Sequence, residues 1–289
     1  MNESFNDQLD RSGHYTRPDD IFHLLKLGLK AIRYPVLWEK HQPVKEKAID
    51  WSPVENNLKL LSESGISIIA GLVHHGSGPA FTNLLDPDFP DLLAEYAAQV
   101  AIKFPFIKYY TPVNEPLTTA RFSGLYGHWY PHHKNDRSFS RMLINEIKGI
   151  VLSMRSIRAV NPDAELIQTE DLTKIHSTTA LSYQARFENK RRWLTYDLLT
   201  GKVTPRHRFW KYFLDNGIRK EELQFFIDEP CIPSIAGFNY YVTSERYLDE
   251  NVDAYPPAIC GGNGLNNYAD TEAVRKIRLC GLKKLLKEA

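Results

Sequence analysis

Residues 107–116 read IKYYTPVNEP, a short apolar and aromatic run that becomes polar at its end. Its β-branched and aromatic side chains predict a buried strand at Ile107–Val113. Asn114 and Glu115 follow this strand directly, before Pro116. In a parallel barrel, the side chains that do chemistry gather at the carboxyl ends of the strands. The stretch therefore predicts both a parallel strand and part of a polar site.

Helix and strand signals alternate on both sides of this stretch. Short apolar runs predict four further strands, at 31–38, 66–73, 165–169 and 235–242, and none of comparable signal after Val242. Apolar residues at helical spacing predict helices at 19–28, 53–64, 90–103, 139–160, 180–200, 206–226 and from 270 to the C-terminus. Strands that alternate with helices favour the α/β class, with a parallel sheet covered by helices.

The composition describes a globular chain with balanced charge. Of its 289 residues, 43% are hydrophobic and 12% aromatic, which suffices for a sizeable core and excludes a disordered chain. The length suits one or two domains, or a single α/β barrel of about 250 residues. The 36 basic and 35 acidic residues leave a net charge of +1, so we expect neither nucleic acid nor a membrane as a partner.

The cysteines and the N-terminus bear on the compartment. Cys231, Cys260 and Cys280 are widely spaced, and their odd number indicates free thiols in a reducing environment. No apolar run approaches the roughly 18 residues of a membrane span, and residues 1–16 form a polar segment without a signal-peptide core. We therefore expect a cytoplasmic protein.

Each predicted strand runs into residues suited to hydrogen bonding. These are Arg33 and Glu39 for the first strand, His74 and His75 for the second, Asn114 and Glu115 for the third, Glu170 and Asp171 for the fourth, and Asn239, Tyr240 and Tyr241 for the fifth. Such groups bind sugar hydroxyls, and two carboxylates can cleave a glycosidic bond. We expect a pocket for a small carbohydrate or glycoside, with no cofactor.

His128, His132 and His133 raise the question of a metal site. They lack the spacing of known metal motifs, so we predict no metal and a loop that faces solvent or sugar. We expect Trp129 and Trp193 to pack in the interior. A barrel lyase or isomerase would need a phosphate-binding loop or metal ligands, which the sequence does not show.

The order of these motifs resembles glycoside hydrolase family 1, within the superfamily of (β/α)8 glycosidases. Residues 114–116 resemble the family's Asn-Glu-Pro motif, and residues 32–35, 72–75 and 237–241 resemble its second, third and sixth strands. The resemblance covers residues 17–245. It implies a TIM (β/α)8-type barrel and a retaining β-glycosidase of the β-glucosidase type.

The resemblance also implies roles for single residues. Glu115 corresponds to the general acid/base at the end of strand four. The substrate-binding positions carried over by the motifs are Arg33, which lies beneath the catalytic carboxylates, His74, which contacts the sugar, Asn114, Asn239, and Tyr241, which lies against the nucleophile. His75 stands where the family normally has a Trp.

One bacterial subgroup resembles the chain in further detail. Residues 17–20, 33–39 and 168–171 look like proteins in which a family 1-like barrel is fused to a dTDP-4-dehydrorhamnose reductase-like domain. The chain has no Gly-rich dinucleotide fingerprint, so we expect the reductase half to be absent.

By this resemblance the chain holds strands two to six and lacks strands one, seven and eight. We expect residues 1–289 to form one barrel domain truncated at both ends. The family's nucleophile lies on strand seven, so we expect the chain alone to be weakly active or inactive. Glu170 is an alternative second carboxylate.

Two alternatives to an enzyme stay open. One is a non-catalytic sugar-binding or scaffold protein, and the other is a fragment completed by another polypeptide. Open sheet edges also predict self-association or pairing with a complementing chain.

Overall fold

The structure is a computed structural model that describes residues 7–17 and 19–289. These residues divide into two compact units. Unit 1 holds the chain up to Thr169 together with Asp197–Ala236, and unit 2 holds Glu170–Tyr196 and Gly237–Ala289. The division does not test the predicted single domain, which stays a prediction.

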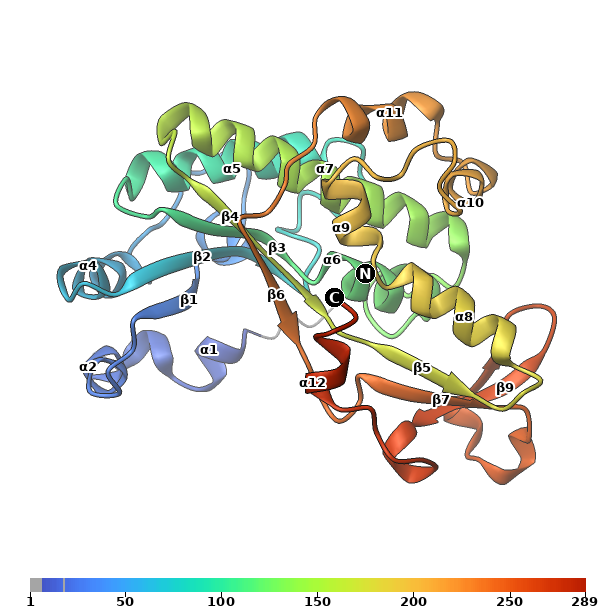
Figure 1. The fold of residues 1–289 in the computed structure, drawn as a ribbon. Helices are drawn as coiled ribbons and strands as arrows, with labels where there is room; N and C mark the ends of the chain where they lie inside the picture. Colours follow the sequence, from blue (N-terminus) through green and yellow to red (C-terminus); the bar gives the residue numbers. More distant parts are fainter. Residues whose placement is uncertain (1–6, 18) are drawn as a thin grey trace. The chain divides into compact units, whose positions relative to one another are not determined.

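Five strands form the larger sheet, in the order β1-β2-β3-β4-β6 (Figure 1). They are β1 (Ala31–Pro35), β2 (Ser67–His74), β3 (Tyr109–Asn114), β4 (Glu165–Asp171) and β6 (Ile235–Asn239). Neighbouring strands from β1 to β4 pair in parallel, and the register sets His74 beside Asn114. All five predicted strands are present, which confirms the α/β class.

Helices of unit 1 bury their apolar faces. In α4 (Glu55–Glu63) the buried residues include Leu58 and Leu61, and α5 (Phe89–Lys103) packs along α7 (Asp136–Val160). The helix α7 begins three residues before its predicted start, because Asn135 Oδ1 accepts the Ser138 N–H at 2.8 Å and caps the helix. No helix in the described part of the chain is both long and apolar enough to cross a membrane.

Most other helices are short. They are α1 (Gln8–Arg11), α2 (Asp20–Leu25), α3 (Trp38–His41), α6 (Pro116–Ala120), α8 (Ser182–Arg191), α9 (Leu194–Leu199), α10 (Trp210–Asp215), α11 (Lys220–Asp228) and α12 (Leu282–Leu285). A π-helical turn, Arg121–Leu125, follows α6, and four 3-10 turns lie at His14–Thr16, Val252–Ala254, Pro257–Ile259 and Ala273–Arg275.

Unit 2 contains a second sheet with the order β5-β7-β9-β8. Its strands are β5 (Lys174–Ser177), β7 (Glu245–Asp249), β8 (Cys260–Gly262) and β9 (Asn267–Glu272). The strands β5 and β7 pair in parallel, whereas β9 pairs antiparallel with β7 and β8. A small apolar cluster around Ile175 and Leu248 lies against this sheet.

The expectations for the last third of the chain are wrong in two respects. Three strands follow Val242, and β9 occupies the start of the segment predicted as a helix from Asp270. Burial there alternates, with Ala269, Thr271 and Ala273 inside, which is the period of a strand. The buried positions hold small or polar residues, so this alternation does not appear as an alternation of hydrophobicity, which is what the sequence pattern measures.

Candidate functional site

A hydrogen-bond network joins the carboxyl ends of β1, β3 and β4 within unit 1. Arg33 Nη1 donates to Asn114 Oδ1 at 2.7 Å and to Thr169 Oγ1 at 2.9 Å. The Thr169 hydroxyl donates to the same Asn114 oxygen at 2.9 Å. Because Asn114 Oδ1 accepts both bonds, its Nδ2 is turned the other way, where it lies 3.1 Å from His75 Nε2. The network therefore fixes which end of the Asn114 amide faces His75.

Glu115 follows β3 in a left-handed backbone conformation. Its φ is 46° and its ψ 60°, and the residue is 2% exposed. This conformation costs a residue with a Cβ about 1–2 kcal/mol, so the surroundings must hold it. The Glu115 N–H donates to the Thr169 carbonyl at 3.2 Å, and Pro116 begins α6 directly afterwards. The strand end and the helix start together place the carboxyl.

His75 lies between the Asn114 amide and the Glu115 carboxyl. Its φ of 56° is also left-handed, and its Nδ1 is 3.2 Å from Thr119 Oγ1. The Asn114 Nδ2 donates to Nε2, which leaves the ring proton on Nδ1. Burial, then the nearby His74 and Arg33, lowers the pKa of His75 to about 4. The ring is therefore neutral near pH 7, and its 3.7 Å approach to Glu115 Oε2 is not an ion pair.

A cavity of about 1120 Å³ opens in unit 1 beside this network. Its lining includes Arg33, Glu39, His74, His75 and Trp129. The volume is ample for a small ligand, and the mixture of polar groups and an aromatic wall suits hydroxyl-rich molecules. Burial, and secondarily Arg33, lowers the pKa of His74.

The predicted residues differ in how they reach this cavity. Arg33 and His74 line it, as does His75, whereas Asn114 and Glu115 do not belong to its described lining and lie behind His75. The structure thus brings together the unit 1 residues predicted from the sequence, in two layers. Trp129, expected to pack in the interior, has its ring 5.0 Å from the His75 ring and lines the cavity.

Glu39 is a further carboxyl at the cavity that the prediction of site residues missed. It belongs to α3, just after β1, and its Oε2 is buried without a hydrogen-bond partner in the described part of the chain. Burial, with a smaller contribution from the Asp7 charge, raises the pKa of Glu39 to about 7. Its position at the end of the first predicted strand was the available signal, but the sequence does not reveal burial of the carboxyl.

Glu170, Asn239 and Tyr241 belong to unit 2. Glu170 is buried, and its Oε2 accepts the Thr195 hydroxyl at 2.7 Å. The Asn239 carbonyl accepts the Leu172 N–H at 2.8 Å, and Tyr241 is 52% exposed. Their roles in a sugar site stay predictions.

Two histidines of the loop after α6 contact neighbouring groups of unit 1. There, His132 Nδ1 lies 3.0 Å from the Gly127 carbonyl oxygen and His133 Nδ1 lies 2.7 Å from Ser138 Oγ. Within residues 7–17 and 19–289, the group whose ligand atoms converge is His176, Glu245 and Cys280 in unit 2.

Solved β-glucosidases share this fold over part of their length. No protein-family model matches the chain. A β-glucosidase from Thermotoga maritima in complex with cyclophellitol superposes with a TM-score of 0.70 at 18% identity, over 83% of this chain and 56% of that one. The AHE enzyme from Alicyclobacillus herbarius gives a TM-score of 0.70 at 19% identity, over 81% and 56%.

The family 1 enzyme of Thermotoga maritima was also solved with isofagomine lactam. That structure gives a TM-score of 0.69 at 18% identity, over 83% of this chain and 56% of that one. The chain thus spans little more than half the length of the enzymes it resembles. These matches confirm the predicted partial TIM (β/α)8-type barrel, in which five strands are present.

Proposed function

We propose that the chain is a glycoside hydrolase-like protein of the retaining β-glycosidase type, with Glu115 as its general acid/base. The observation that carries this proposal is the placement of Glu115 at the end of β3. There, a left-handed backbone and the Arg33–Asn114–His75 network orient polar groups next to a ligand-sized cavity. Backbone strain of this kind clusters at functional sites.

The residues of unit 1 have distinct roles in this proposal. Arg33 orients the Asn114 amide, and His74 presents a neutral ring to a sugar hydroxyl in the cavity. Glu115 donates its proton to the leaving glycosidic oxygen, which is the first half of acid/base catalysis in glycosidases. The neutral His75 ring sets no positive charge beside that carboxyl.

A retaining reaction also needs a nucleophilic carboxylate about 5–5.5 Å from the acid, and an inverting reaction needs one about 6.5–9.5 Å away. We propose Glu170 as the alternative second carboxylate and Asn239 and Tyr241 as substrate-binding residues. The motif resemblance implies a nucleophile on a seventh barrel strand, beyond the five-strand sheet observed. We therefore propose that this chain alone turns over glycosides weakly or not at all. We also propose that it is related to the barrels fused to reductase-like domains.

A sugar-binding role without catalysis is the second candidate. The observation that favours it is that Glu115 lies behind His75 and not in the described lining of the cavity. In either case we propose that the open sheet edges pair with a second copy or a complementing chain. Light scattering of the purified chain tests pairing with a second copy, and a strictly monomeric chain contradicts that form of pairing.

Calorimetry and hydrolysis together separate these candidates. The Thermotoga maritima enzyme has been solved with deoxynojirimycin and with glucoimidazole, which are suitable probes here. We expect binding of glucoimidazole and little hydrolysis of an aryl β-glucoside, with residual hydrolysis lost in Glu115→Gln. Absence of binding by every gluco-configured probe refutes a sugar site. Robust turnover that Glu115→Gln abolishes refutes the weak-activity proposal.

A further inference from the structure

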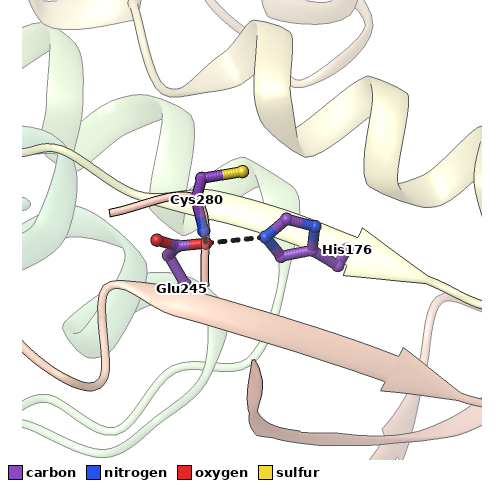
Figure 2. Close-up of side chains that lie close together, drawn as sticks. All are labelled: His176, Glu245 and Cys280. Carbon is purple, nitrogen blue, oxygen red and sulfur yellow. Dashed lines mark hydrogen bonds and ion pairs between the residues drawn. The ribbon is translucent and has the colours of Figure 1, made fainter. Parts of the chain in front are cut away.

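Three side chains with metal-binding atoms come together in unit 2 (Figure 2). His176 lies on β5, Glu245 begins the neighbouring strand β7, and Cys280 precedes α12. The imidazole Nε2 is 2.8 Å from Glu245 Oε2, and the three possible ligand atoms lie within 4.8 Å of one another. In Figure 2 the His176 ring is turned toward the carboxylate, and Cys280 lies beside both.

We propose that His176, Glu245 and Cys280 bind one zinc ion. Imidazole nitrogen, carboxylate oxygen and thiolate sulfur are the three ligand types of protein zinc sites. The thiolate favours zinc over magnesium and calcium, which select oxygen ligands. The proposal is independent of the glycosidase proposal, since none of these residues belongs to the network of unit 1.

The observed separations are close to those that zinc requires. Tetrahedral bonds of about 2.0 Å to nitrogen and oxygen and about 2.3 Å to sulfur place the ligand atoms about 3.3–3.5 Å apart. The His176–Glu245 pair must open by about half an ångström to admit the ion. The Cys280 sulfur must move about an ångström closer to the other two ligand atoms, and rotation of the Cys280 side chain can supply this movement.

Glu245 is already oriented as a ligand. It is fully buried, and its two oxygens accept the N–H groups of Cys280 and Gly281, each at 2.8 Å. The Tyr240 hydroxyl donates to Oε1 at 2.8 Å. Burial alone raises the pKa of Glu245, but these N–H groups and the two side-chain partners outweigh it and bring the pKa to about 2. Such outer hydrogen bonds hold a metal-binding carboxylate ionised and in place.

Binding is balanced in charge and protons. The Cys280 thiol releases its proton to solvent. The neutral His176 ring moves its proton from Nε2, where it bonds to Glu245, to Nδ1 by exchange with solvent, and then binds through Nε2. The carboxylate and thiolate then neutralise the two positive charges of the ion. The hydrogen bond between His176 and Glu245 is replaced by two bonds to zinc. Because His176 and Cys280 are partly exposed, water can reach the fourth position.

Metal titration of the full chain tests the site directly. The purified, reduced chain is stripped with a chelator and titrated with zinc by calorimetry, and with cobalt for the absorption band of a thiolate–cobalt bond. We expect one ion per chain and a higher midpoint of thermal unfolding with zinc, because an ion bound only to the folded state stabilises it. No binding, or cobalt binding without a thiolate band, overturns the proposal.

The variants separate this site from adventitious binding. Cys280→Ser keeps the backbone N–H that Glu245 accepts, so we expect a folded chain that loses the thiolate band and binds zinc at least ~10-fold more weakly. His176→Gln should weaken binding similarly. The matched control is Cys260→Ser, whose Sγ lies 3.5 Å from the Pro256 carbonyl oxygen within another loop. Equal zinc binding by Cys280→Ser and the unsubstituted chain shows Glu245 to be only a structural anchor for residues 280–281.

Discussion

Replacing Glu39 by Gln should stabilise the chain increasingly as pH rises. The Glu39 Oε2 is buried without a partner among the described residues, and the pKa is raised from an ordinary 4.5 to about 7. Above pH 7 the folded chain must therefore hold a desolvated carboxylate whose Oε2 has no hydrogen-bond partner among the described residues. Glutamine has nearly the same shape and carries no charge, so the variant removes this penalty.

The size and sign of the effect follow from proton linkage. Below pH 4.5 the carboxyl is protonated in both the folded and unfolded states, and no penalty arises. Between pH 4.5 and 7 the folded state retains a proton that the unfolded state loses, so the stability of the unsubstituted chain falls as pH rises. Above pH 7 the difference levels off at about 3 kcal/mol, since each pKa unit corresponds to about 1.4 kcal/mol.

Urea unfolding followed by tryptophan fluorescence measures this difference. Four of the five tryptophans, Trp38, Trp51, Trp129 and Trp210, lie in unit 1 with Glu39, so the signal reports mainly on that unit. The free energies of unfolding of the variant and the unsubstituted chain are compared from pH 4 to pH 8, with the exposed Glu46→Gln as the matched control. If the introduced glutamine amide makes a new hydrogen bond, the difference in unfolding free energy changes by the same amount at every pH and keeps its pH dependence. A difference that does not change with pH refutes the assigned burial of Glu39.

Other substitutions test the remaining features of the structure. Arg33→Met removes two hydrogen bonds from a charged donor, so the free energy of unfolding should fall by about 2–4 kcal/mol and glucoimidazole should bind more weakly. Unchanged stability in urea contradicts a stabilising role of these two hydrogen bonds. Glu245→Gln should destabilise the chain at pH 7, and this loss of stability should shrink as pH falls from 4.5 toward 2. The reason is that the lowered pKa of Glu245 stabilises the folded state only while the carboxylate is ionised. Thermal unfolding across that pH range measures the loss, and a loss that is independent of pH contradicts the prediction. Gly124→Ala places a Cβ 2.8 Å from the Phe139 backbone nitrogen in α7, so we expect the free energy of unfolding to fall by about 1–3 kcal/mol. A variant as stable as the unsubstituted chain shows that this contact is not tight.

The five strands of the larger sheet were predictable from the sequence. Strands buried on both faces, such as β3, appear as short apolar runs, and helices between them keep a longer period. Polar residues in or just after these runs, namely Arg33, His74, Asn114 and Glu115, were thus predicted as site residues, and the structure places them close together. Resemblance to a family added the expected roles and the expected partial barrel.

Contacts across long sequence separations were decided only by the tertiary structure. Nothing local distinguishes Glu39 from a solvated glutamate, because its pKa depends on what covers it. His176 and Glu245 are 69 residues apart and meet only because β5 pairs with β7. That sheet escaped prediction because β5 and β8 are very short and the buried positions of β9 hold small or polar residues. Local patterns report hydrophobic period, whereas burial of a charge and the meeting of distant ligands depend on how the strands pair.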